Sequence, residues 1–121
     1  MFNNCSSLTS FNSNLQSLTN ARYMFQGCSN LEEFSAPLTS LVRNGYCMFS
    51  GCKLNAASVQ HIAENLPEYQ APTKAADDLG NSNIITIHIN TSMSEEDKTL
   101  VRAAFHSIQD KGWTVQANMA F

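Results

Sequence analysis

A 23-residue repeat constrains the fold of this chain more than any other feature. Residues 1–23 begin Met-Phe-Asn-Asn-Cys, residues 24–46 begin Met-Phe-Gln-Gly-Cys, and the two segments are identical at ten positions. A third copy opens at Met48, with Cys52 four residues further on as in the earlier copies, and Leu54 follows Leu31 by 23 residues. A fixed period of this length is typical of arrays in which each repeat forms one coil and buries its apolar faces against its neighbours. The repeat therefore predicts a solenoid.

Composition and charge exclude several classes of protein. The 121 residues are enough for one continuous core. Seven Lys and Arg against ten Asp and Glu give a net charge of −3, which argues against a nucleic-acid partner, because binding to phosphates requires a basic face. No apolar run approaches the roughly 20 residues that span a bilayer, and no signal peptide is visible, so we expect no membrane insertion.

The first repeat lacks the features of a terminal cap. Met1 holds the same repeat position as Met24 and Met48, and the residues that follow it form an ordinary repeat. Arrays of this kind normally end in an atypical coil with a polar outer face. We therefore expect either further repeats N-terminal to Met1 or a partner that covers the first coil.

Three of the four cysteines hold one repeat position: Cys5, Cys28 and Cys52, with Cys47 outside the register. Stacked coils would place successive cysteines about 5 Å apart, the spacing of neighbouring strands. We interpret them as a column of small buried apolar side chains, because free cysteine is among the most buried residue types. A disulfide between neighbouring coils is the alternative. No CxxC pair is present and no histidine keeps a fixed offset from the cysteines, so we expect no metal site.

Short strands are predicted over residues 7–12 and 30–35. We expect the apolar residues of these strands, together with the matching leucine of the third copy, to point into the core: Leu8, Phe11, Leu31, Phe34 and Leu54. The remaining apolar positions are expected to pack between stacked coils: Leu15, Leu18, Tyr23, Leu38, Leu41 and Tyr46.

After Leu54 the pattern becomes helical. Asn55 is a suitable N-cap, Pro67 blocks continuation, and the apolar residues between them follow helical spacing: Val59, Ile62, Ala63 and Leu66. Residues 67–83 contain many loop-forming residues and no apolar period, so they are predicted to be a loop.

The C-terminal third predicts a strand, a helix and a second strand. Residues 84–90 alternate with period two, and residues 113–119 alternate again. Between them Ser94 begins a helix with one apolar stripe: Leu100, Val101, Ala104, Phe105 and Ile108. A strand–helix–strand unit of this spacing forms a parallel pair. We therefore divide the chain into repeats over residues 1–55, two full and one partial, and α/β capping coils of the same domain over residues 56–121.

The repeat motif resembles the BspA-like leucine-rich repeats. The resemblance rests on MF-x2-C-x2-L-x2-F, which ends in Tyr and restarts at MF-x-G-C, and on GCKLNAASVQHIAENLP, ITIHIN and DKGWTV. It implies a right-handed α/β solenoid with a parallel sheet, exposed on the surface of a gut or oral bacterium and active in adhesion or protein–protein binding. The alternative is a structural or receptor-facing component of a phage particle. The resemblance supplies no catalytic residue and no cofactor.

Few residues suggest chemistry. A thiol nucleophile at Cys47 or Cys52 with His61 is the one enzymatic pair to consider, but no local motif supports it, so we expect no catalytic residues. The acidic run 95–97 is better explained by the positive end of a helix than by a Ca²⁺ site. Trp113 is expected to be an apolar anchor that closes the last coil, with an exposed sugar-binding aromatic as the alternative.

A candidate binding face follows from the outward strand positions. We expect these residues to lie on one sheet face, which would be mostly uncharged and able to contact a protein or a glycan. A plain solvated face is the alternative. The residues are Thr9, Ser10, Asn12, Glu32, Glu33, Ser35, Thr86, His88, Thr114, Gln116 and Asn118.

Overall fold

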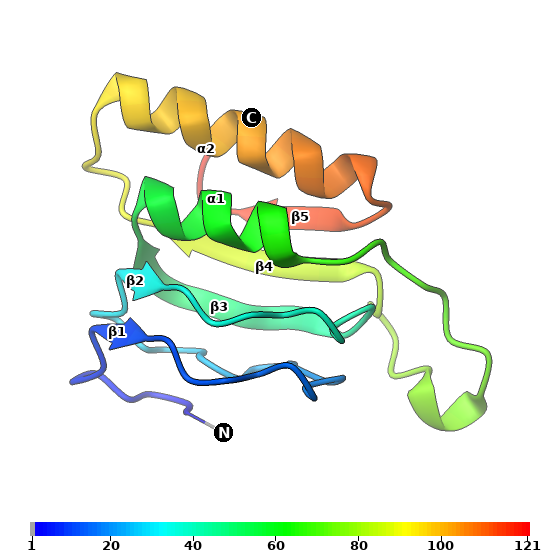
Figure 1. Cartoon of the computed structure of the whole chain (residues 1–121). Helices are drawn as coiled ribbons and strands as arrows, with labels where there is room; N and C mark the ends of the chain where they lie inside the picture. The colour runs from blue at the N-terminus through cyan, green and yellow to red at the C-terminus, as the bar shows by residue number, and fades with distance from the viewer. Residues whose placement is uncertain (1) are drawn as a thin grey trace.

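Two parallel sheets and two α-helices make up a small mixed α/β fold (Figure 1). The computed structural model describes residues 2–121, apart from the side chain of Asp77. Strands β1 and β2 form one sheet, and β3, β4 and β5 form the other. In chain order the elements are β1 (Ser10–Phe11), β2 (Glu33–Phe34), β3 (Gly45–Leu54), α1 (Ala56–Asn65), the 3₁₀ turn η1 (Ala75–Asp77), β4 (Ile84–Ile89), α2 (Glu95–Asp110) and β5 (Thr114–Ala117).

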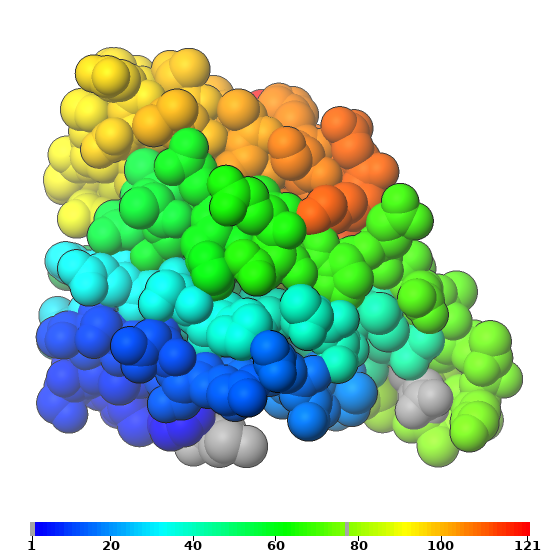
Figure 2. Space-filling model, in the orientation of Figure 1, coloured from blue at the N-terminus to red at the C-terminus, as the bar shows by residue number. Residues whose placement is uncertain are grey.

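The elements are stacked in chain order from one end of the molecule to the other. On one side, β1 contacts β2, β2 contacts α1, and α1 contacts α2. On the other side, β3, β4 and β5 form a continuous parallel sheet (Figure 1). The colour bands of the space-filling view follow the same order, from the first repeat to α2 (Figure 2). Each segment therefore packs mainly against the segment before it and the segment after it.

The Met-Phe segments of successive repeats lie side by side. The backbone N–H of Phe2 donates to the carbonyl of Met24 over 2.8 Å, and the N–H of Phe25 donates to the carbonyl of Met48 over 2.9 Å. Met48 belongs to β3. The hydrogen-bonded ladder of the larger sheet thus continues through the second repeat into the first.

This arrangement corrects the prediction for the strands. Within residues 7–12 and 30–35 only the two-residue strands β1 and β2 form, and they pair with each other in parallel. The ten-residue strand β3 instead covers the Met-Phe segment of the third copy. The backbone is left-handed at Cys47 (φ 57°) and Gly51 (φ 80°), and this interrupts the alternation of buried and exposed side chains along β3. The sequence pattern therefore did not predict this strand.

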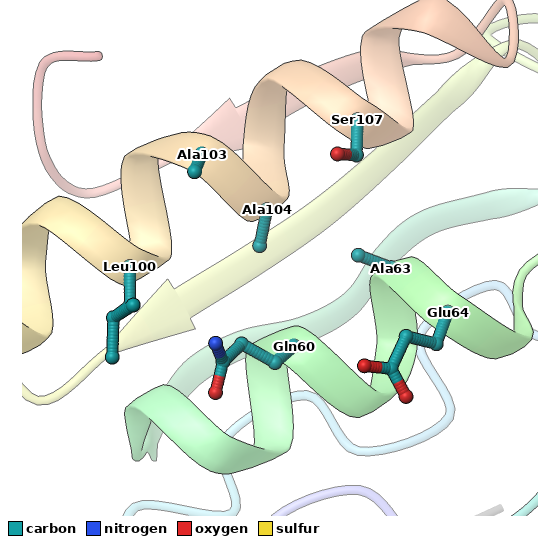
Figure 3. A pocket seen from close by; sticks show the side chains of 7 residues that line it. All are labelled: Gln60, Ala63, Glu64, Leu100, Ala103, Ala104 and Ser107. Carbon is teal, nitrogen blue, oxygen red and sulfur yellow. The ribbon is translucent and has the colours of Figure 1, made fainter.

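Both predicted helices form with the expected caps. The Asn55 side chain accepts a hydrogen bond from the backbone N–H of Ser58, and the Ser94 side chain accepts one from Asp97. The predicted apolar stripe of α2 is buried except for Leu100, which is 40% exposed. Leu100 lies at a groove of about 200 Å³ between α1 and α2, where it extends toward Gln60 (Figure 3). It lies beyond the edge of the buried stripe, so that part of the prediction is wrong.

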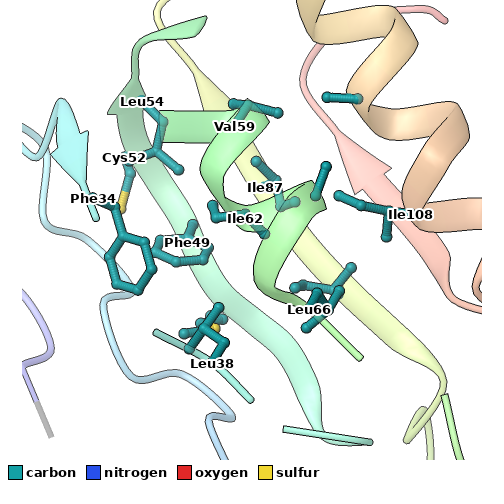
Figure 4. Packing of buried hydrophobic residues seen from close by; sticks show 14 of the residues in the cluster. Phe34, Leu38, Phe49, Cys52, Leu54, Val59, Ile62, Leu66, Ile87 and Ile108 are labelled. Atoms are coloured by element: carbon teal, nitrogen blue, oxygen red, sulfur yellow. The ribbon is translucent and has the colours of Figure 1, made fainter. Parts of the chain in front are cut away.

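Stacked phenylalanines form the centre of the core. Phe25 lies between two parallel rings, 5.4 Å from Phe2 and 5.6 Å from Phe49. Phe34 stacks on Phe11 in a second column and meets Phe49 edge-on at 4.9 Å. Figure 4 shows Phe34 and Phe49 beside the apolar residues of α1 and β4. The repeat therefore places the same side chain at the same point in successive layers.

The cysteines form the expected column. The thiol of Cys28 donates to the carbonyl of Phe2 over 2.9 Å, and the thiol of Cys52 donates to the carbonyl of Phe25 over 3.3 Å. Both side chains are buried, and Cys5 is half-buried. All four cysteines are free thiols, so the disulfide alternative is not adopted here.

Helix α1 replaces the strand that a third repeat would have added beside β2. The Ser58 hydroxyl accepts from the backbone N–H of Phe34 over 2.8 Å and donates to the carbonyl of Glu32 over 3.0 Å. Nε2 of His61 contacts the carbonyl of Ala36 at 2.9 Å. Two side chains one helical turn apart thus complete the hydrogen bonding of the β2 edge.

The C-terminal strands pair in parallel as predicted, and the register places Ile85 opposite Val115. Strand β4 also pairs with β3 in parallel, with Leu54 opposite Ile89. Trp113 is 3% exposed, and its ring N–H donates to the carbonyl of Pro67 over 2.9 Å. The expectation of a buried anchor is confirmed.

Replacing Phe25 with alanine should be one of the most destabilising single changes in the chain. Its ring contacts four other rings, those of Phe2, Phe11, Phe34 and Phe49. We expect a loss of about 3–5 kcal/mol in the free energy of unfolding, measured by urea titration. Phe11→Ala should cost roughly half as much, because Phe11 is only half-buried. Equal losses in the two variants would contradict the central position of Phe25.

Candidate functional site

The expected binding face is divided between two surfaces. Because β1 and β2 form a sheet separate from β3, β4 and β5, the outward residues of the two halves do not share one sheet face. The prediction of a single face is therefore wrong. We call the first group the β1–β2 face: Thr9, Ser10, Asn12, Glu32, Glu33 and Ser35. We call the second the β4–β5 set: Thr86, His88, Thr114, Gln116 and Asn118.

Side chains of the β4–β5 set complete the hydrogen bonding of the sheet. Thr86 is only 3% exposed; its hydroxyl accepts from the backbone N–H of Cys47 over 2.9 Å and donates to Oε1 of Gln116 over 3.1 Å. Nδ1 of His88 accepts from the backbone N–H of Gly51 over 2.8 Å. Cys47 and Gly51 are the left-handed residues of β3, and their N–H groups are bound by side chains of β4 rather than by its backbone.

The remaining residues of the β4–β5 set also form hydrogen bonds within the chain. Asn118 continues the pairing beyond the end of β5, because its side chain accepts from the N–H of Ile89 and donates to the carbonyl of the same residue, over 2.9 and 3.0 Å. The hydroxyl of Thr114 accepts from the side chain of Asn83 over 3.1 Å. The structure therefore explains the β4–β5 set without a ligand.

His88 is held in its neutral form. Its ring is half-buried, and burial lowers the pKa of the imidazole from its ordinary value of 6.5. Since Nδ1 accepts the Gly51 N–H, protonation of Nδ1 would also remove that hydrogen bond. The hydrogen bond and the burial of the ring thus both favour the neutral imidazole.

The β1–β2 face lies open to solvent. All six of its side chains are exposed. Within residues 2–121, none of the six makes a side-chain hydrogen bond or an ion pair. Ser10 lies directly opposite Glu33 in the register of the two strands. The face continues into a pocket of about 270 Å³ whose polar lining comes from β2, the residue after it, and the start of α1: Glu33, Ser35, Asn55, Ser58 and His61.

Two other hollows lie elsewhere on the described chain. The groove between α1 and α2 has a mixed lining that includes Glu64, Ala103 and Ser107 (Figure 3). A hollow of about 340 Å³ lies where β3 and β4 end, and its polar lining includes Lys53 and Asn90. The groove between the helices has no strand residue in its lining, and in the second hollow the side chains of His88 and Asn118 already bind backbone groups of the sheet.

The suspected cysteine–histidine pair is not assembled. Burial raises the pKa of Cys52 to about 12 and also raises the pKa of Cys28. The ring nitrogens of His61 contact Ala36 and Asn65, and no hydrogen bond in the described chain joins His61 to Cys47 or Cys52. Among the same residues, no group of three His, Cys, Asp or Glu could hold a metal ion, and no helix is long and apolar enough to cross a membrane.

Sequence reasoning missed an aromatic cluster on the surface. The guanidinium of Arg22 lies 5.8 Å from the ring centre of Tyr23 and 5.2 Å from that of Tyr46, and it donates to the carbonyl of Gly80 over 2.7 Å. The Tyr23 ring meets the Tyr46 ring edge-on at 5.7 Å, which is the expected contact between repeats, but Tyr23 is 38% exposed and therefore lies at the surface. The recurrence of Tyr shortly before the second and third Met-Phe pairs was the available signal, but it did not indicate exposure.

Comparison with protein-family models, with curated proteins and with solved structures finds no match to this chain.

Neutral His88 should make the stability of the protein depend on pH. Because its pKa is lower in the folded state, its contribution is complete above about pH 6.5 and is lost as the pH falls through the folded-state pKa. His88→Asn keeps an acceptor for the Gly51 N–H but does not titrate. Urea unfolding between about pH 5 and 7.5 should therefore show a smaller acid loss for the variant. Superimposable pH profiles would contradict this role.

Two of the four thiols should react readily with an alkylating reagent, and the other two should be protected by burial. Cys5 and Cys47 are half-buried, whereas Cys28 and Cys52 are buried. At about pH 8 a thiol with the pKa of Cys52 is ionised in only about one molecule in 10⁴. Mass spectrometry after brief alkylation should show labels on Cys5 and Cys47 in the folded protein and on all four in urea. Rapid labelling of Cys52 in the folded protein would refute the buried column.

Proposed function

We propose that this chain is a non-enzymatic leucine-rich-repeat interaction module of a surface-exposed bacterial protein, with the right-handed solenoid and the adhesive role that BspA-like repeats imply. The main support is that equivalent residues of successive repeats, 23 or 24 positions apart, lie next to each other. Phe2, Phe25 and Phe49 stack in one column, and the Met-Phe backbones pair in sequence. Such stacking extends an exposed surface and creates no deep cleft.

The β1–β2 face is the binding surface in this proposal. Its side chains carry hydroxyl, amide and carboxylate groups that have no partner within the described residues. The β4–β5 set is not included, because Thr86 and His88 satisfy backbone groups of β3. An exposed residue without an internal role is a better candidate for recognition than one that stabilises the sheet.

The chemistry of the face suits a protein partner that presents Lys or Arg. Glu32 and Glu33 are adjacent and exposed, and hydroxyl groups of Ser10 and Ser35 lie on the same face. Carboxylates form charge-assisted hydrogen bonds with Arg and Lys, and complementary charge guides two surfaces into register. The pocket beside Glu33 has the exposed hydroxyl of Ser35 in its lining, next to this acidic pair.

A double substitution tests this assignment. Glu32→Ala with Glu33→Ala should weaken binding to a basic extracellular protein about 2- to 30-fold without lowering the melting temperature, since exposed ion pairs contribute about 0.2–1 kcal/mol each. The chain would be immobilised on a biosensor and tested against a panel of host extracellular proteins, with parallel glycan arrays.

The matched control is Glu95→Ala with Glu96→Ala, which removes two exposed negative charges from the start of α2. This variant should bind like the unmodified chain. An equal loss in both variants would indicate a nonspecific charge effect, and unchanged affinity after the first substitution would exclude the β1–β2 face. Binding to glycans alone would overturn the choice of a protein partner.

A further inference from the structure

A polar hollow lies where strands β3 and β4 end. Its volume is about 340 Å³, and its lining comes from the last residues of β3, the end of β4, the turn that follows β4, and Asn118. Because β3 and β4 are parallel, both strands end at the same edge of the sheet. Small-molecule sites in proteins have volumes of about 300–1,000 Å³ and contain a few convergent polar groups. The hollow is therefore large enough for a molecule the size of a sugar.

Three exposed side chains of this lining carry donors that the fold does not use. The ammonium group of Lys53 forms no hydrogen bond or ion pair within residues 2–121. The hydroxyl groups of Thr91 and Ser92 also have no hydrogen-bond partner there. An ammonium group can only donate, whereas a hydroxyl group can donate or accept. The hollow thus offers more donors than acceptors to a ligand.

His88 adds a donor that the sheet holds in place. Its Nδ1 accepts from the backbone N–H of Gly51 over 2.8 Å, and burial lowers the pKa of the imidazole, so the ring is neutral. In a neutral imidazole, the nitrogen that does not accept a hydrogen bond carries the proton. The proton therefore lies on Nε2, which has no partner among the described residues. The hydrogen bond that completes β3 thus also fixes a free donor on a residue that lines the hollow.

The charge of the lining indicates the kind of ligand. Lys53 is its only charged residue, and no Asp or Glu of the described chain contributes to it. The acidic residues 95–97 at the start of α2 come shortly after the same turn, but none of them lines the hollow. An ammonium group beside N–H and O–H donors suits a phosphate or sulfate group, whose oxygens carry negative charge and accept hydrogen bonds. A neutral hydroxylated ligand would leave the ammonium group without an opposite charge.

We propose that this hollow binds a phosphate or sulfate group carried by a small hydroxylated molecule, with Lys53 and Nε2 of His88 donating to the anionic oxygens. The hydroxyl groups of Thr91 and Ser92 supply further hydrogen bonds to the same ligand. This inference does not depend on the proposed function, which concerns the β1–β2 face. The hollow shares no residue with that face or with the pocket beside it.

An NMR titration of the nitrogen-labelled chain tests the binding. The probes are glucose-6-phosphate, glucose-6-sulfate and glucose, each added to about 20 mM at constant ionic strength, because salt screens exposed charges. The two charged probes should cause saturable shifts of the backbone amides of Gly51 and Thr91 and of the His88 ring, and glucose should cause none. Binding of only one charged probe would support the site and identify its anion. Equal binding of glucose, or no saturable shift with either charged probe, would overturn the proposal.

Lys53→Gln is the variant that tests the charge. Lys53 is exposed and its side chain has no partner among the described residues, so the variant should fold like the unmodified chain. Its affinity for the charged probes should fall about 3- to 10-fold, as expected for the loss of one charged hydrogen bond at a partly open site. Lys74→Gln is the matched control, since it removes an exposed lysine from the loop over residues 67–83. It should bind like the unmodified chain. An equal loss in both variants, or unchanged affinity in Lys53→Gln, would contradict the assigned site.

Discussion

The stacking of identical side chains from one repeat to the next is the interaction on which the rest of this structure depends. A single 23-residue segment contains little regular structure; β1 and β2 have two residues each. Its apolar residues become buried only when another layer covers them, as Phe25 is covered by Phe2 and Phe49. The hydrogen bond from Cys28 to the carbonyl of Phe2 adds a polar link between the same two layers. Burial of apolar area between layers thus replaces the local stability that short strands lack.

Where the repeat pattern ends, backbone groups of β2 and β3 no longer have a further repeat to bind. Side chains of the next elements bind these groups on both sides of the molecule. Beside β2, Ser58 and His61 of α1 bind backbone groups that a further strand would have bound. Beside β3, Thr86 and His88 of β4 accept the N–H groups of its left-handed residues. Buried backbone groups left without partners would be costly, so these four residues allow a repeating layer to join a regular βαβ unit.

The hydrogen bonds of the outward strand residues reduce the number of candidate binding residues. Residues that appeared equivalent as outward strand positions separate into those that complete the sheet and those with no internal role. The buried cysteines are likewise structural, because burial raises the pKa of Cys52 to about 12 and keeps its thiol protonated. The β1–β2 face remains as a surface whose side chains have no partner among the described residues.

The sequence by itself determined the repeat, the column of cysteines, both helices with their caps and the parallel pairing of the two C-terminal strands. These features depend on residue spacing and on local capping, which are written directly in the chain. Only the tertiary structure decided which segment forms β3, which outward residues share a face, and why His61 and His88 occur where they do. Left-handed residues at Cys47 and Gly51 break the alternation that identifies a strand. The backbone N–H groups of these two residues bind the side chains of Thr86 and His88, which lie almost 40 residues further along the chain. No local sequence pattern could indicate such distant partners.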